Sequence, residues 1–440
     1  MQSAKTPLGA IQKFLHSPLA GGAILIMCTI VALIFSHLDA TSAWYAGLWE
    51  SSLTIGFPGF GITHTIQEWI NDALMAVFFF AVGLEIKREI VAGQLKSFHQ
   101  ASLPIAAAIG GMIVPALIYV SFNEGTPSAH GWGIPMATDI AFALGVLSMF
   151  SSRVPLSLKV FLTALAIVDD LGAILVIAIF YSSSINFVML GCAALIFIYL
   201  MLLNHYNVYK MRMYLIPAIV LWFLFLNSGV HATIAGVLIA MTMPSSSKFT
   251  KAQFIQRSAE LLSIFKKSEQ GLELINNETQ HQALQELRVI SRNTISPIQR
   301  LEHALHSSVN FFIMPIFALA NAGVVIAMTD LPALLDSQGL GIELGLIIGK
   351  PIGIVLFSWI IIKMGLSQMP QGATWPKLIG VGCLGGIGFT MSIFIDMLAF
   401  SDPTMVSYGK MAILTASIIA GIVGSVVLMN TKKVESRYHW

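Results

Sequence analysis

Charged side chains are scarce in this sequence of 440 residues. Asp, Glu, Lys and Arg together make up 10% of it, whereas hydrophobic residues make up 56%. A typical soluble domain has about 25% charged residues. The mean hydropathy of +0.79 agrees with the low charge. This composition excludes an ordinary soluble domain and indicates a chain whose solvent is mainly a lipid bilayer.

Cysteine is also rare, with three in the chain. Cys28, Cys192 and Cys383 lie far apart in apolar stretches, so they predict neither a disulfide framework nor a metal site. The net charge of +2 gives no sign of a nucleic-acid partner. No motif predicts a bound cofactor.

Long hydrophobic runs are what the sequence has instead. Windows of about 19 residues predict twelve membrane-spanning helices. We expect the first run to be a retained helix, because it is long for the core of a signal peptide. The spans are predicted at 18–37, 67–86, 102–122, 133–150, 157–181, 187–204, 211–226, 229–243, 307–328, 341–362, 378–399 and 409–429.

Lys and Arg are distributed unevenly between the two sides of these spans. If the N-terminus is cytoplasmic, nearly all of them fall on that side; Lys350 lies within a span and Lys410 borders the last one. The bias predicts a multi-pass protein with both termini in the cytoplasm.

The predicted organisation has three parts: spans 1–8 in residues 1–244, a polar cytoplasmic helical loop at 245–306, and spans 9–12 with a tail at 307–440. The loop pattern favours an amphipathic helix on the inner leaflet or against the bundle, or else a solvated helical linker. Residues 53–64 alternate around a Pro-Gly turn and predict an external hairpin, which needs a partner because a lone hairpin is marginal in water.

Four charged residues lie within predicted spans: Asp139, Asp169, Asp170 and Lys350. Each costs about 2.5–3.5 kcal/mol at mid-bilayer on insertion scales, so it needs a function or a partner. Structural ion pairing is one explanation, but one lysine neutralises only one of the two adjacent aspartates. We expect that pair to titrate as a coupled unit and to bind either a proton or a small hard cation such as Na+ or Li+.

Glycine and proline interrupt two of the spans. Gly131, Gly133 and Pro135 precede Thr138 and Asp139 in the fourth, and the eleventh has four glycines within 382–388. In lipid, the backbone groups that such breaks free must face a cavity or an ion.

These spans are the middle helices of two three-span blocks, 102–181 and 341–429, a pattern typical of inverted-repeat transporters. At such a crossing we expect Asp139 to offset helix N-termini and Lys350 to offset helix C-termini. The predicted fold class is an all-α polytopic membrane protein with twelve transmembrane helices and inverted three-helix repeats.

Several long motifs resemble those of the NhaA-type sodium/proton antiporters. They are WINDALMAVFFFAVGLEIKREI, MATDIAFALGVL, RVPLSLKVFLTALAIVDDLGAILVIAI, NSGVHATIAGVLIA, RLEHALH, PIFALANAGV, GKPIGI and GGIGFTMSIFI. They occur along nearly the whole chain. The resemblance implies a transporter, not an enzyme, that exchanges intracellular Na+ or Li+ for external protons in the bacterial inner membrane.

The same resemblance implies roles for individual residues. Asp170 would be the main sodium ligand, Asp169 the partner of Lys350, and Thr138 and Asp139 would lie at the crossing of the broken helices. Transport would be electrogenic, with more protons than sodium ions per cycle, and the external hairpin would join two copies into a homodimer.

Regulation by pH would be carried by residues that match the family's regulatory positions. They are Glu85, Arg88, Glu89, His231, Glu302, His303 and His306. From the residues alone, His303 and His306 are ordinary residues at the end of a loop.

Two departures from the family pattern stand out. The loop before Arg300 is longer than expected, which leaves the pH set-point open. Asp396 replaces an uncharged residue near the outer end of the eleventh span. We expect it to face solvent at the membrane surface, with an additional cation-attracting group as the alternative.

Three other classes of membrane protein require features that the sequence lacks. An intramembrane aspartyl protease also needs two membrane aspartates, but on separate helices with room for water between them, and the GxGD pattern is missing. A channel would need a filter-like repeat. A sodium-coupled solute carrier would need polar specificity groups in the spans.

Overall fold

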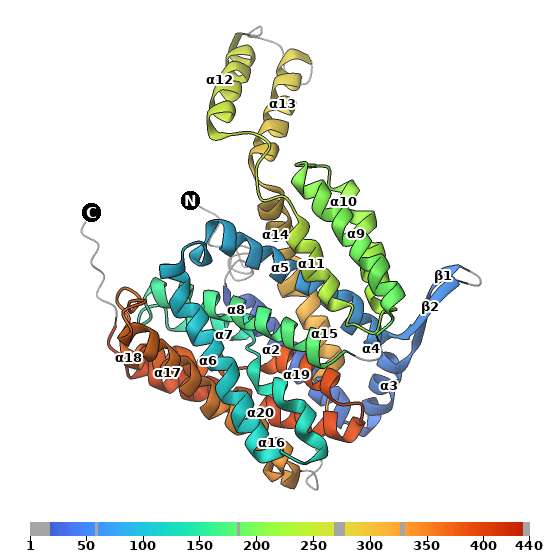
Figure 1. The fold of residues 1–440 in the computed structure, drawn as a ribbon, viewed down its shortest axis with the longest axis vertical. Coiled ribbons are helices and arrows are strands. Elements are labelled where there is room, and N and C mark those ends of the chain that lie inside the picture. Colours follow the sequence, from blue (N-terminus) through green and yellow to red (C-terminus); the bar gives the residue numbers. More distant parts are fainter. Residues whose placement is uncertain (1–17, 58–59, 183–184, 268–277, 326–330, 434–440) are drawn as a thin grey trace.

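The chain folds into a bundle of helices with one small β-hairpin, as the computed structural model shows (Figure 1). The structure describes residues 18–57, 60–182, 185–267, 278–325 and 331–433.

The elements up to residue 242 are α2 Pro18–His37, α3 Asp39–Glu50, β1 Ser52–Phe57, β2 Phe60–Thr65, α4 Ile66–Trp69, η2 Ile70–Leu74, α5 Met75–Ala92, η3 Gln94–Lys96, α6 Phe98–Asn123, η4 Pro127–Met136, α7 Ile140–Met149, α8 Leu156–Phe180, α9 Phe187–His205, α10 Arg212–Leu226 and α11 Thr233–Thr242. The elements after it are α12 Lys251–Lys267, α13 Glu278–Thr294, α14 Pro297–Ser308, η6 Val309–Ile313, α15 Met314–Asn321, η7 Leu331–Leu335, α16 Ser337–Leu344, η8 Gly345–Gly349, α17 Lys350–Lys363, α18 Trp375–Gly385, α19 Phe389–Ala399 and α20 Pro403–Met429.

Within the described residues, eight helices are long and apolar enough to cross a membrane, and ten if each of two bent pairs is one span. Two shorter apolar helices, α10 and α11, account for the remaining predicted spans. The ninth span begins earlier than expected, because α14, η6 and α15 run continuously from Pro297 rather than from residue 307.

Both predicted interruptions are confirmed. Each of the pairs η4–α7 and α18–α19 bends by 44° at its break. Residues 137–139 separate the first pair and residues 386–388, which include two glycines, separate the second. The two breaks leave four helix ends inside the bundle.

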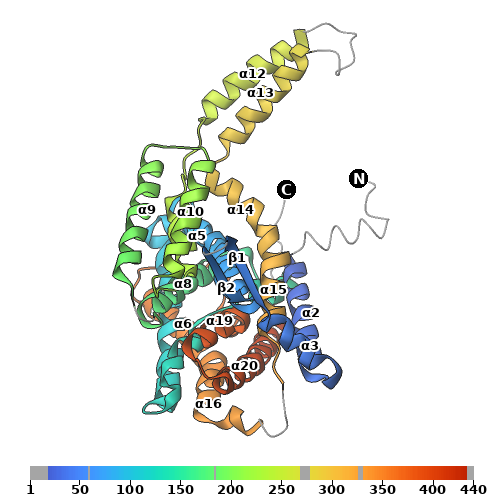
Figure 2. The ribbon, with the colours of Figure 1, turned by 90° about the vertical axis from the view of Figure 1, so that its right-hand side faces the viewer.

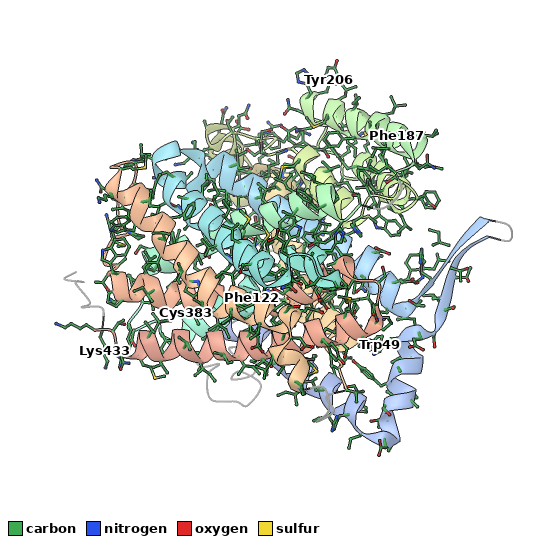
Figure 3. The ribbon with its side chains drawn as sticks, turned by 60° about the horizontal axis from the view of Figure 1, so that its bottom comes forward. Trp49, Phe122, Phe187, Tyr206, Cys383 and Lys433 are labelled. Atoms are coloured by element: carbon green, nitrogen blue, oxygen red, sulfur yellow. The ribbon has the colours of Figure 1, made fainter. Side chains whose placement is uncertain are left out.

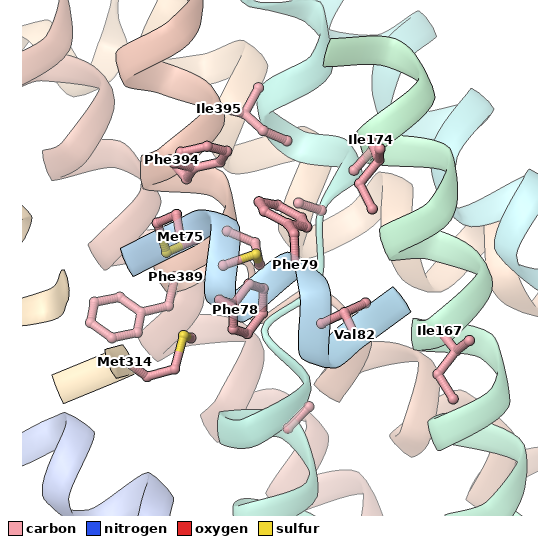
Figure 4. Close-up of a cluster of buried hydrophobic side chains, with 14 of the residues drawn as sticks. Met75, Phe78, Phe79, Val82, Ile167, Ile174, Met314, Phe389, Phe394 and Ile395 are labelled. Atoms are coloured by element: carbon pink, nitrogen blue, oxygen red, sulfur yellow. The ribbon is translucent and has the colours of Figure 1, made fainter. Parts of the chain in front are cut away.

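The main hydrophobic core of the bundle includes side chains of α5, α8, α15 and α19. The ring of Phe79 contacts that of Phe394 on α19 at a centroid distance of 5.6 Å, and Phe394 also contacts Phe317 on α15 at 6.1 Å. Side chains of α8 lie on the other side of α5, as Figure 4 shows for Ile167 and Ile174. Helix α5 therefore packs between α8 and α19.

Helices α6 and α17 touch through their backbones. A Cβ added at Gly353 would lie 2.1 Å from the carbonyl oxygen of Gly110, and one added at Gly110 would lie 2.3 Å from that of Gly353. Such close contact between glycines is a common way for membrane helices to pack. It fixes the position of α17 within one turn of Lys350.

The polar loop forms a helical hairpin, α12 and α13, that stands away from the bundle (Figure 2). The hairpin has a small hydrophobic core of its own, centred on Leu261, Ala283 and Ile290. The amphipathic helix predicted for this loop therefore packs against a second helix of the loop and not against the bundle, and its contact with the inner leaflet stays a prediction. The base is closed by a hydrogen bond from Lys248 N to Asn293 O, 3.0 Å long.

The predicted β-hairpin is confirmed, with β1 and β2 paired antiparallel from Ser52↔Thr65 to Phe57↔Phe60. The hydroxyls of Thr54 and Thr63 lie 2.8 Å apart across the strands. The Trp69 indole anchors the hairpin to the bundle by donating to Leu53 O at 2.9 Å. The predicted Pro-Gly turn at 58–59 lies outside the described residues.

Large apolar side chains are exposed on the outer helices. Phe187 and Tyr206, at the two ends of α9, are 78% and 74% exposed and point outward in Figure 3. An apolar exterior over a packed interior is the arrangement expected of helices that face lipid.

Asp396 departs from its predicted position. We expected it to face solvent, but it is 0% exposed on α19, and neighbouring α20 buries Lys410 to 8% exposure. The prediction of a surface acid is wrong, because the eleventh span continues to Ala399 and α20 begins at Pro403 and covers it.

The α6–α17 contact predicts that Gly353→Ala destabilises the bundle. The new methyl group would overlap a backbone carbonyl, and overpacking of this kind costs about 1–3 kcal/mol. Thermal unfolding of the purified protein in detergent measures the effect. Gly191→Ala on α9, where nothing lies within 4 Å of the added Cβ, is the matched control. Equal midpoints for the two variants would contradict the proposed backbone contact.

Candidate functional site at the helix crossing

The two broken helices cross at their breaks and are joined there by their backbones. Asp139 N donates to Ile387 O at 2.7 Å, which links the break of the first pair to that of the second. The Ser392 hydroxyl donates to Ile134 O at 2.8 Å and adds a second link. Four helix ends are thereby brought together in the apolar interior.

Asp139 accepts hydrogen bonds from the N-termini of both α7 and α19. One carboxylate oxygen accepts from Phe142 N at 3.0 Å, which makes Asp139 the N-cap of α7. The other oxygen accepts from the Thr390 hydroxyl at 2.5 Å and from Thr390 N at 3.3 Å, in the first turn of α19. A negative side chain is favourable at this point because helix N-termini carry partial positive charge.

The side chains of Thr138 and Lys350 contact backbone carbonyls at the C-termini of α18 and η4. The Thr138 hydroxyl lies 2.8 Å from Gly385 O, at the end of α18. The Lys350 ammonium donates to Met136 O, at the end of η4. These contacts supply partners for carbonyls that the broken helices cannot satisfy internally.

Lys350 also forms a fully buried ion pair with Asp169. Its Nζ lies 2.5 Å from Asp169 Oδ2, and both side chains are 0% exposed. The Thr138 hydroxyl contacts the same carboxylate oxygen at 2.7 Å. The other oxygen, Oδ1, is buried without a hydrogen-bond partner among the described residues.

Asp170 has different surroundings from its neighbour. Consecutive residues point about 100° apart around an α-helix, so the two carboxylates of α8 face different groups. Asp170 is 4% exposed, and the described residues offer its oxygens no hydrogen bond. The charged groups that act on it are Asp169, Glu85, Asp139 and Lys350.

The charges of this site do not balance. The acids Asp139, Asp169 and Asp170 lie around one base, Lys350, and two helix N-termini partly offset Asp139. One carboxylate is left over, and a buried carboxylate needs a proton or a cation. Among the described residues, no group of three or more His, Cys, Asp or Glu side chains could hold a metal ion. The arrangement offers carboxylate and carbonyl oxygens for a weakly held hard cation.

Four of the predicted pH-response residues cluster at the C-terminal end of α5. Arg88 lies 2.8 Å from Glu89, 3.9 Å from Glu85 and, through Nε, 3.3 Å from Glu302 on α14. Glu85 also acts electrostatically on Asp170, so the cluster and the crossing interact.

The three histidines lie outside this cluster. His303 and His306 are exposed on α14, and among the described residues neither has an ion pair or hydrogen bond with the Arg88 group. His231 follows α10, and its Nε2 lies 2.8 Å from Tyr181 O.

Thr390 and Ser417 also contribute to the crossing and were not predicted from the sequence. Thr390 binds Asp139, and the Ser417 hydroxyl of α20 accepts from Phe389 N at 3.1 Å. Thr390 lies directly after the glycine-rich break, within GGIGFTMSIFI, and that position was the available signal. Ser417 lies in an ordinary apolar span and gave none.

The Lys350 contacts predict that Lys350→Ala lowers thermal stability. The substitution leaves Asp169 as a buried charge and Met136 O without its donor, and removing one partner of a buried pair costs about 3–5 kcal/mol. The loss should shrink as pH falls, because a protonated Asp169 needs no counterion. Lys363→Ala, at the exposed end of the same helix, is the control and should change the midpoint little. A midpoint for Lys350→Ala that equals the parent's at every pH would contradict the ion pair.

Comparison with known proteins assigns the chain to a family. The model of the family described as "Na+/H+ antiporter 1" matches residues 12–428. The "Na(+)/H(+) antiporter NhaA" of Oleidesulfovibrio alaskensis is 49% identical over 424 residues, 96% of this chain and 94% of the relative. The "Na(+)/H(+) antiporter NhaA 2" of Syntrophotalea carbinolica is 47% identical over 418 residues, 95% of each chain. The "Na(+)/H(+) antiporter NhaA" of Salmonella arizonae is 43% identical over 417 residues, 94% of this chain and 96% of the relative. With a family model that covers nearly its whole length and relatives this similar, the chain is a multi-pass membrane protein that belongs to the NhaA family of Na+/H+ antiporters.

Proposed function

We propose that this protein exchanges cytoplasmic Na+ or Li+ for external protons across the inner membrane of a bacterium. The observation that carries the proposal is the buried charge imbalance at the crossing, where Asp169 and Asp170 share the single base Lys350. Membership of the Na+/H+ antiporter family supports the choice of ions.

Competition for the same oxygens would couple the movement of Na+ to that of protons. With Lys350 paired to Asp169, the carboxylate left over at Asp170 accepts either a proton or a Na+ ion, but not both. Carboxylate oxygens suit such a hard cation. If the site opens to one side at a time, the release of one ion on each side is coupled to the uptake of the other.

Separate roles for the two aspartates follow from their contacts. Asp170 is the main Na+ ligand, since it has no hydrogen bond within the described chain and retains slight exposure. Asp169 is held by Lys350 and Thr138 and regulates the charge of the site. With two acids that can each carry a proton, more protons than Na+ ions move per cycle, so exchange is electrogenic.

The chain is proposed to cross the membrane twelve times, with both termini in the cytoplasm. Eight long helices, two bent pairs and two short apolar helices supply that number. Each bent pair is the middle element of a three-span block, 102–181 or 341–429, and the blocks form the inverted repeat. Alternating access would come from movement at the crossing of these two pairs.

The Arg88 group is proposed as the pH-responsive element. Its ion pair with Glu302 joins α5 to α14, whereas its pairs with Glu85 and Glu89 lie within α5. Protonation of Glu302 weakens that connection, and protonation of Glu85 or Glu89 changes the charge around Arg88. Because Glu85 also acts on Asp170, the change reaches the ion site.

A homodimer through the external hairpin is also proposed. The hairpin projects from the bundle, and Leu53 and Ile55 are 46% and 55% exposed on it (Figures 1 and 2). A two-stranded hairpin is marginal alone, so pairing with the hairpin of a second copy would stabilise it.

We predict that Asp170→Asn abolishes Na+-dependent proton movement. The amide can neither release a proton nor bind the ion with a full charge. Dequenching of a pH-sensitive dye in membrane vesicles, as Na+, Li+ and K+ are added in turn, measures the exchange. The control is Asp402→Asn, at the exposed N-cap of α20, where Asn caps as well as Asp. Parent-like exchange in Asp170→Asn would overturn the assignment of the site.

We further predict that the helical hairpin α12–α13 is dispensable for exchange but affects its pH dependence. The hydrogen bond between Lys248 N and Asn293 O brings its two ends together, so a short Gly-Ser linker can replace residues 249–292 without strain. Exchange should persist, with its pH profile shifted because Glu302 lies on the next helix. Complete loss of transport in a correctly inserted variant would show that the hairpin is part of the transport core. The control is a full-length variant in which the residues of α12 are scrambled, so that the loop keeps its length and composition.

A further inference from the structure

Asp396 is a buried acid that the crossing does not use. It is 0% exposed on α19, and neither carboxylate oxygen has a hydrogen-bond partner within the described chain. The carboxylate packs directly on the backbone of α20, where a Cβ at Gly409 would come within 2.0 Å of Asp396 Oδ1. No other carboxyl group of the described residues has both oxygens buried and unpartnered.

The groups around Asp396 do not supply the missing hydrogen bonds. Two phenols act on it electrostatically, but the Tyr119 hydroxyl donates to Ser128 O at 2.7 Å and the Tyr181 hydroxyl donates to His130 O at 2.8 Å. Lys410 of α20 is the charged neighbour. In the part of the chain that the structure describes, Lys410 and Asp396 do not form a direct ion pair.

An ionised carboxylate in these surroundings would be strongly disfavoured. An ion removed from water without a direct partner is strongly destabilised. A proton neutralises it and needs no further ligands. A Na+ ion would need several more oxygens and would lie near the ammonium of Lys410. The surroundings therefore favour a proton over a metal cation.

We propose that Asp396 is a second proton-binding site, which holds a proton in this conformation and releases it on forming an ion pair with Lys410. The O–H bond breaks, the proton passes to water, and the carboxylate left behind binds the ammonium. The inference rests on the proposed Na+/H+ exchange and places this acid on the side of the crossing that the proposed orientation makes external.

The position of Asp396 on α19 links it to the crossing. Thr390, which binds Asp139, lies six residues earlier on the same short helix, about 9 Å along its axis. A displacement of α19 at the crossing therefore moves Asp396 relative to Lys410 on α20. Formation of the ion pair in one conformation and its separation in the other would couple proton release to the movement of the broken helix.

Infrared spectroscopy of the full-length protein tests the protonation directly. The parent minus Asp396→Asn difference spectrum should contain the C=O stretch of a protonated carboxylic acid at neutral pH. The corresponding spectrum for Asp402→Asn, an exposed acid, should contain only carboxylate bands. Absence of the acid band from the Asp396 spectrum would overturn the proposal.

Lys410→Met gives a second readout that leaves the carboxyl group in place. Without the ammonium, Asp396 loses the partner that stabilises its ionised form, so the acid band should persist to a higher pH than in the parent. An unchanged titration of the band would mean that Lys410 does not pair with Asp396, and the proposal would fail. Asp396→Glu, made in the parent background, keeps a carboxyl group beside Lys410, so its acid band should titrate as in the parent.

Transport separates this proposal from the one for Asp169 and Asp170. In proteoliposomes, Asp396→Asn should keep Na+ affinity within about twofold of the parent's, since α8 is intact. The curve of exchange rate against external pH should show one titration step fewer than the parent's. A parent-like external pH profile, or loss of Na+ binding, would contradict a separate proton site. If Asp170→Asn still exchanged ions while the Asp396 acid band remained, the main site would be wrong and this one would stand.

Discussion

The structure depends on satisfying helix ends inside an apolar interior. Two broken helices place N-termini and C-termini at the centre of the bundle, where lipid and packed side chains offer no hydrogen bonds. Asp139 accepts from both N-terminal ends, and Lys350 and Thr138 donate to the C-terminal carbonyls. Without these side chains the breaks would leave unpaired backbone groups, and the crossing would not be stable.

The same contacts create the chemistry of the site. Lys350 is needed for a helix end, and its charge then holds Asp169. One base cannot neutralise both neighbouring acids, so in the proposed mechanism a transported ion supplies the missing positive charge. The residues that stabilise the helix ends are then the same ones that we propose to bind the ions, and the loss of one contact would affect both roles.

Packing determines how movement reaches this site. Helix α5 lies between α8, with its two aspartates, and α19, which carries Thr390 and Asp396 (Figure 4). The Arg88 group is at the other end of α5 and connects it to α14. Rotation or translation of α5 would thus displace the Arg88 ion pairs, the two aspartates of α8 and the broken helix α19. The α12–α13 hairpin, with a core of its own, lies outside this path.

The sequence by itself determined the spans, the two interruptions and the four charged residues inside them. These features are local: a bilayer requires continuous apolar runs, glycine and proline weaken a helix wherever they occur, and a charge within a span is conspicuous in any fold. The family resemblance rested on motifs such as those around Asp169 and Asp170, and the comparisons agree with it.

Only the tertiary structure decided which groups meet. The sequence did not show that Thr390 would bind Asp139, and the pairing of Asp169 with Lys350 was expected only from the family resemblance. It also placed Asp396 in solvent, because a position near the end of a span is exposed unless another helix covers it, as α20 does here. Contacts between residues far apart in the chain depend on how helices pack, and the pattern along a single helix does not contain that information.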